Sequence, residues 1–125
     1  MELKMESGTY YIGDPSYIIK GNQGYLWIEK LWDEFYKDEI PAKFLNIDGI
    51  SIFLGQTYGG DGIYNGFYVD SGVICVLKID MLFNDERFSI KEMKGTKIET
   101  FNTPLLINYN EGIFNIGNLI INTKF

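Results

Sequence analysis

Residues 72–77, with the sequence GVICVL, form an uninterrupted apolar run near the middle of the chain. A strand that is covered on both faces lacks the alternation of apolar and polar residues that a half-exposed strand shows. The run therefore predicts a central β-strand, which we expect to continue to residue 82. It contains Cys75, the only cysteine, which we interpret as a buried apolar side chain and not a nucleophile, because the sequence has no histidine to activate it.

Short β-prone segments divided by turn signals lie on both sides of this run. Asp48-Gly49 is a two-residue signal typical of a type I′ hairpin, and Lys94-Gly95 predicts a second hairpin. The segment that begins at Ser7 is a predicted strand, in which Tyr10 and Ile12 should share one face. With the central run, the predicted strands are 7–13, 44–47, 50–54, 73–82, 88–93, 96–101, 105–109, 113–116 and 119–122.

A single amphipathic helix is predicted over residues 25–38, ending before Pro41, after a turn at residues 21–24. Its apolar side chains recur at helical spacing and form one stripe suited to packing on a sheet, namely Ile28, Leu31, Trp32 and Phe35. The fold class is therefore mainly β, at the border of α+β. We expect a compact antiparallel β sandwich or barrel-like sheet of about nine short strands with this helix packed on it.

Length and charge narrow the classes of function. At 125 residues, the chain is expected to be a single β-rich domain over residues 1–125. A net charge of −6 disfavours DNA or RNA polymers as partners. The sequence shows neither a leader pattern nor an apolar run long enough to span a membrane, and its lone cysteine suits a reducing compartment, so we expect a cytoplasmic protein with no membrane partner. Without histidine, serine and cysteine triads and the usual zinc ligands are excluded.

Residues 55–72, GQTYGGDGIYNGFYVDSG, have the composition of a ligand-binding loop. Glycine allows close backbone approach and tyrosine offers a flat face with a polar tip. The same composition also suits a structural hairpin, and both readings stay open. The candidate ligand-binding residues in this stretch are Tyr58, Gly59, Gly60, Asp61, Gly62, Tyr64, Asp70 and Ser71.

Three aspartates, each within two residues of a glycine or proline, are candidate site residues: Asp14, Asp61 and Asp70. If they meet in space, they could act as a general acid and base or hold a divalent cation, although no specific metal site or cofactor is predicted. For Asp14 the simpler alternative is a local turn in which its carboxylate accepts backbone N–H groups. Tyr11, Asp14 and Tyr17 complete the set of candidate ligand-binding residues.

The segments SGTYYIGDPSY (7–17), YGGDGIY (58–64) and VDSGVICV (69–76) together resemble small bacterial and bacteriophage proteins of uncharacterised function. The resemblance covers about residues 7–17 and 58–76. It implies a compact β-rich domain and a phage or mobile-element origin, with the host cytoplasm as the location, and it supplies no established active site.

Three functions follow as hypotheses. The first is a non-enzymatic small-molecule binder, a phage-encoded sponge that sequesters a cyclic or ADP-ribose-type nucleotide immune signal. The second is a metal-assisted hydrolase or phosphodiesterase that uses Asp14, Asp61 and Asp70 as catalytic groups. The third is a protein interaction module that inhibits a host protein through the tyrosine-rich loop or an edge strand. Self-association into a homo-oligomer is compatible with each of them.

Overall fold

The apolar run becomes strand β7 (Val73–Lys78), the middle strand of a five-stranded antiparallel sheet in the computed structural model, which describes residues 1–124. The strands of this sheet follow the order β3 (Ala42–Ile47), β4 (Ile50–Gln56), β7, β2 (Gly8–Gly13) and β8 (Lys97–Phe101). Val73, Cys75 and Leu77 face one core cluster, whereas Ile74 and Val76 face the other. The predicted burial of this strand on both faces is confirmed.

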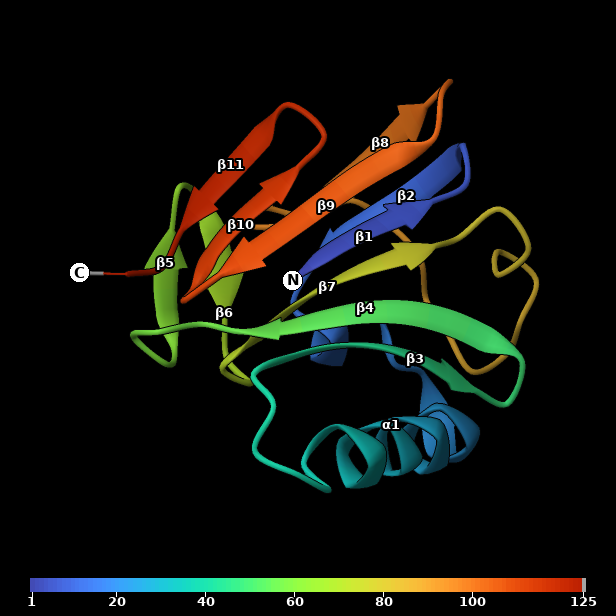
Figure 1. Cartoon of the computed structure of the whole chain (residues 1–125). Helices are drawn as coiled ribbons and strands as arrows, with labels where there is room; N and C mark the ends of the chain where they lie inside the picture. Colours follow the sequence, from blue (N-terminus) through green and yellow to red (C-terminus); the bar gives the residue numbers. More distant parts are fainter. Residues whose placement is uncertain (125) are drawn as a thin grey trace.

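A second antiparallel sheet packs on one face of the first, which makes a sandwich (Figure 1). Its strands follow the order β1 (Glu2–Met5), β9 (Leu105–Asn110), β10 (Ile113–Ile116) and β11 (Leu119–Asn122). The sheets approach closely at Gly55, where a Cβ atom would lie 2.5 Å from the Phe114 ring. About 45% of the residues are in strands and 15% are helical, and the described strands do not close into a barrel, so the sandwich prediction is confirmed.

Helix α1 (Gly21–Phe35) covers the opposite face of the five-stranded sheet, as Figure 1 shows. Trp27, Leu31 and Phe35 are at most 1% exposed, and burial of each such side chain contributes roughly 1.5–3 kcal/mol. The Trp27 indole N–H donates to the carbonyl of Ile47 at 3.1 Å, which ties the helix to β3. No helix in residues 1–124 has the length and apolar character needed to cross a membrane.

The helix begins four residues before the predicted start and ends at Phe35. Residues 21–24 were predicted as a turn, but they form its first turn. Gly24 is needed for close packing, because a Cβ there would lie 2.3 Å from the carbonyl oxygen of Arg87. A glycine that serves close approach inside a helix was therefore mistaken for a turn signal.

The predicted strand over residues 88–93 is wrong, and β7 ends at Lys78 instead of residue 82. Phe88 forms an isolated bridge with Ile19, and the Ser89 N–H donates to the Ile18 carbonyl. These contacts hold the start of the segment against the α1 side, so it does not pair with β8. After β7, the Ile79 N–H donates to Thr9 and a turn follows.

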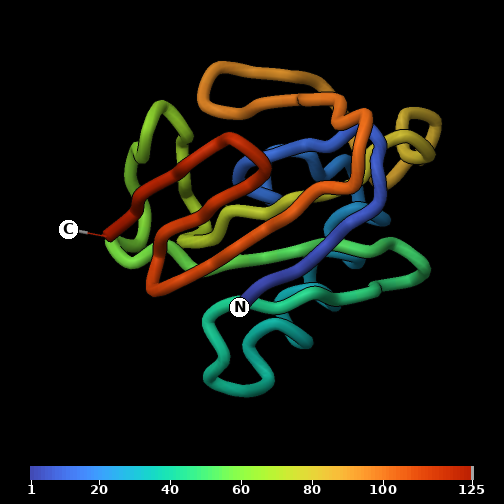
Figure 2. Tube along the Cα trace, turned by 45° about the horizontal axis from the view of Figure 1, so that its top comes forward, coloured from blue at the N-terminus to red at the C-terminus, as the bar shows by residue number. Residues whose placement is uncertain are grey.

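The structure has eleven strands among the described residues instead of about nine. Besides β1, the strands not predicted from the sequence are β5 (Gly62–Tyr64) and β6 (Phe67–Val69), which form a small hairpin at one end of the sandwich (Figures 1 and 2). Asn65 and Gly66 turn it with φ angles of 51° and 87°, the left-handed conformation of a type I′ turn. The glycine-rich stretch is thus largely a hairpin and its connections. The short helix η1 (Pro15–Ile18) completes the elements.

Candidate functional site

The carboxylate of Asp14 lies at the centre of the region that the sequence singles out. Asp14 is 0% exposed although its side chain is polar. Oδ1 accepts the Ser16 N–H at 2.8 Å and the hydroxyls of Ser16 and Ser71 at 2.7 and 2.8 Å. Oδ2 accepts the N–H groups of Asp70 and Ser71, both at 2.7 Å. The predicted local turn is therefore present, and the same carboxylate also fastens the loop between β6 and β7.

Because its two carboxylate oxygens already receive five hydrogen bonds, Asp14 has little capacity left to bind a ligand. Tyr11, at its side, is buried and donates its hydroxyl to the Asp14 carbonyl at 2.6 Å. Burial, more than the neighbouring groups, raises the pKa of Tyr11 far above its ordinary value. Both residues therefore act inside the structure: the Asp14 carboxylate joins η1 to the β6–β7 loop, and the Tyr11 hydroxyl holds the Asp14 carbonyl.

The other two predicted aspartates are exposed. Asp70 accepts a short hydrogen bond from the hydroxyl of Tyr17, whose pKa is raised by burial first and then by this bond. Asp61 lies near the same loop, since a Cβ on Gly72 would be 3.8 Å from its Oδ1. The fold thus brings Asp14, Asp61 and Asp70 into one neighbourhood, but no group of three acidic or cysteine side chains in residues 1–124 is arranged to hold a metal ion.

The remaining predicted ligand residues are spread over the base of the β5–β6 hairpin. Tyr58 is 57% exposed, and one face of its ring lies 5.6 Å from the Lys124 ammonium. Tyr64 is half-buried and donates to the Gly60 carbonyl at 3.0 Å. Gly59, Gly60 and Gly62 are half-buried in the adjoining turn. Tyr11 is fully buried and so cannot form an exposed binding surface with these residues, whose role in ligand binding stays a prediction.

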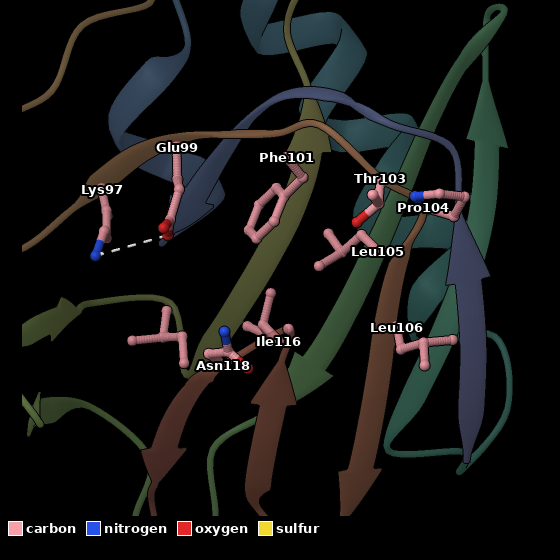
Figure 3. Close-up of a pocket in the computed structure, with 11 residues that line it drawn as sticks. Lys97, Glu99, Phe101, Thr103, Pro104, Leu105, Leu106, Ile116 and Asn118 are labelled. Carbon is pink, nitrogen blue, oxygen red and sulfur yellow. Dashed lines mark ion pairs between the residues drawn. The ribbon is translucent and has the colours of Figure 1, made fainter.

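A groove that was not predicted from the sequence lies between β8 and the β10–β11 turn. Its volume is about 490 Å³. Figure 3 shows Phe101 and the ion pair of Lys97 and Glu99 on one wall, with Ile116 and Asn118 on the other. Leu105 and Leu119 add apolar surface.

The charged side chains of this groove are accessible to solvent, and the ion pair between them is long. The Lys97 ammonium lies 3.6 Å from the Glu99 carboxylate, and the two side chains are 43% and 38% exposed. The sequence pattern of β8 was compatible with either a groove or an exposed strand. Lys97, Glu99 and Phe101 occupy every second position and therefore share one face. Alternating charges are typical of an exposed edge strand, and only the fold shows that this face looks toward the second sheet.

No protein family, curated protein or solved structure matches the chain in comparisons with known proteins. The function must be inferred from the geometry of the chain itself.

Proposed function

We propose that this protein binds a small organic molecule, without chemical turnover, in the groove between β8 and the β10–β11 turn. The observation that carries the proposal is the combination of apolar and accessible polar side chains in one hollow of about 490 Å³. Ligand pockets in proteins commonly occupy 300–1,000 Å³ and combine an apolar lining with a few polar groups that set orientation.

A nucleotide-type molecule is the ligand class that these residues fit best. The partly exposed ring of Phe101 offers a face for stacking a base, and such stacking contributes on the order of 1–3 kcal/mol. The side-chain amide of Asn118 both donates and accepts, as a base edge requires. Lys97 supplies positive charge for a phosphate, while Glu99 can accept a ribose hydroxyl. With so little positive charge at the groove, we favour cyclic or ADP-ribose-type ligands over triphosphates.

Binding without catalysis is favoured by the state of the candidate catalytic groups. Asp14 is saturated with hydrogen bonds, which weakens the hydrolase alternative that depends on it. Burial raises the pKa of the Cys75 thiol well above its ordinary value, so this side chain is a poor nucleophile. Sequestration of a nucleotide immune signal is the specific biological form that we propose for this binding.

Native mass spectrometry with a panel of linear, cyclic and ADP-ribose-type nucleotides tests the proposal. We expect a complex with an unchanged ligand mass. Lys97→Gln and Asn118→Ala should each weaken binding roughly fivefold to tenfold, since each removes a hydrogen-bonding or charged partner. Lys91→Gln is the matched control, because it removes an exposed lysine that does not line the groove.

The result distinguishes the alternatives. A ligand of altered mass would replace the binding proposal with an enzymatic one. Binding that is lost in Asp61→Asn but retained in Lys97→Gln would move the site to the predicted hairpin region. If no nucleotide binds, the proposed ligand class is wrong.

A further inference from the structure

The free edge of β1 lies on the other side of the sandwich, and its backbone groups point into open space. Met1 and Tyr109 exchange two backbone hydrogen bonds, each of 2.9 Å, and the register then pairs Leu3 with Ile107. Hydrogen-bonded and non-hydrogen-bonded pairs alternate along an antiparallel ladder. Glu2 and Lys4 therefore turn their N–H and C=O groups away from β9, and no partner for them is present in residues 1–124.

Two other edge strands have an outward N–H covered by a side chain. On β8, the Ile98 N–H donates to the carboxylate of Glu92 at 2.7 Å. On β11, the Asn122 N–H donates to the side-chain oxygen of Asn65 at 2.8 Å. Such covering is a common way to stop an edge from pairing with another chain. The edge of β1 has no equivalent cover among the described residues.

A hollow of about 300 Å³ lies directly beside this edge. Lys4, Met5 and Glu6 border it, and Phe44 of β3 lines it together with Tyr10. Phe44 is 42% exposed although it shares its face of β3 with Ala42, which is buried between the sheets. The five-stranded sheet thus extends past β1, and Phe44 lies where a further strand of the four-stranded sheet would cover it.

We propose that this edge binds an extended peptide segment of a partner protein as an added antiparallel strand. Residues opposite Met5 and Leu3 would point inward toward the hollow and Phe44, and therefore should be apolar. Residues opposite Lys4 and Glu2 would lie on the exposed face, where opposite charges stabilise a cross-strand pair. Read from its N-terminus, the segment has the pattern apolar, acidic, apolar, basic.

A single extended segment fits this position better than a second copy of the chain. In a symmetric pairing of two β1 strands, the β3–β4 hairpin of each copy would extend toward the same space beneath the joined edge. The charges of β1 alone would permit that pairing, because Glu2 would lie opposite Lys4 of the second copy. The steric conflict at the hairpins decides in favour of a separate peptide.

Fluorescence polarisation with a short labelled peptide tests the inference. The probe carries valine, glutamate, leucine and lysine at its centre, and its control exchanges the glutamate and the lysine. We expect the control peptide to bind about fivefold more weakly or worse, because both cross-strand pairs become repulsive. The double variant Glu2→Lys/Lys4→Glu should reverse the preference, and both substitutions are on exposed side chains that leave the core intact.

Phe44→Ser should weaken probe binding roughly tenfold through loss of apolar contact. Phe83→Ser, which alters an exposed phenylalanine outside the hollow, is the matched control and should bind the probe as the natural chain does. Equal affinity for the two peptides, or no reversal in the double variant, would overturn the inference. A dimer in sedimentation that Phe44→Ser dissociates would assign the edge to a second copy and would overturn it as well.

Discussion

The region around Asp14 and the groove beside β8 both gather charged side chains, but those side chains differ in how many bonds they already make. Asp14 receives five hydrogen bonds and is fully buried, whereas Lys97 and Glu99 form one loose ion pair and remain more than a third exposed. A buried charge must be satisfied by the protein itself, since its desolvation is otherwise too costly. A ligand is therefore expected to bind where polar groups are accessible and still have hydrogen-bonding capacity, as they do in the groove beside β8.

Asp14→Asn should produce the largest effect on stability. Oδ1 accepts the Ser16 N–H and Oδ2 accepts the N–H groups of Asp70 and Ser71, so either orientation of an asparagine amide places its NH₂ against a backbone donor. We expect a loss of about 2–4 kcal/mol in the free energy of unfolding, measured by urea denaturation. Asp61→Asn, an exposed change in the same neighbourhood, is the control. Equal losses in the two variants would contradict the bracing role of Asp14.

Tyr11→Phe should have a smaller effect near neutral pH and a distinct one in alkali. Loss of the hydrogen bond to the Asp14 carbonyl should cost about 1–2 kcal/mol. Burial raises the pKa of Tyr11 in the folded protein above its value of about 10 in the unfolded chain. The unfolded phenol thus ionises first, so this contribution to stability is complete below pH ~10 and falls as the pH rises further.

The measurement is the urea midpoint of the natural chain and of Tyr11→Phe at pH 8 and above pH 10. The natural chain should lose more stability between these conditions than the variant does. Burial also raises the pKa of Tyr10 to about 12, so some alkaline loss should persist in the variant. Tyr58→Phe, which removes an exposed hydroxyl that makes no bond to Asp14, is the control variant. Parallel profiles for the natural chain and Tyr11→Phe would disprove the burial argument.

Local sequence signals predicted much of the fold. The run at 72–77 indicated a strand covered on both faces, and Asp48-Gly49 indicated a hairpin, whose φ angles of 53° and 85° confirm the left-handed turn. Prediction failed where a distant contact decides the conformation. Phe88 is held by Ile19, so its segment is not a strand despite suitable residues.

The candidate site was harder to predict for the same physical reason. The position of Asp14 before Pro15 indicated a local turn, and its bond to Ser16 confirms that turn. Its bonds to Asp70 and Ser71 span more than fifty residues and have no local signal. The groove likewise forms only when β8 and the β10–β11 turn meet, so alternation along β8 could not distinguish a lining strand from an exposed one.

Glu99→Gln should have the smallest effect on stability and so provides the sharpest test of the contrast with Asp14. The ion pair of Glu99 with Lys97 is solvent-accessible, and such pairs contribute about 0–1 kcal/mol. Urea denaturation should therefore detect a change of no more than roughly 0.5 kcal/mol. The substitution also frees Lys97 and lowers the negative charge at the groove, while the glutamine oxygen can still accept a ribose hydroxyl. A phosphate-bearing ligand should therefore bind more tightly in the variant than in the natural chain. Isothermal titration with the nucleotide found by mass spectrometry measures this gain. A large loss of stability would instead show that the fold requires Glu99 as it requires Asp14. The contrast between a fully hydrogen-bonded structural aspartate and a groove free to bind a ligand would then be wrong.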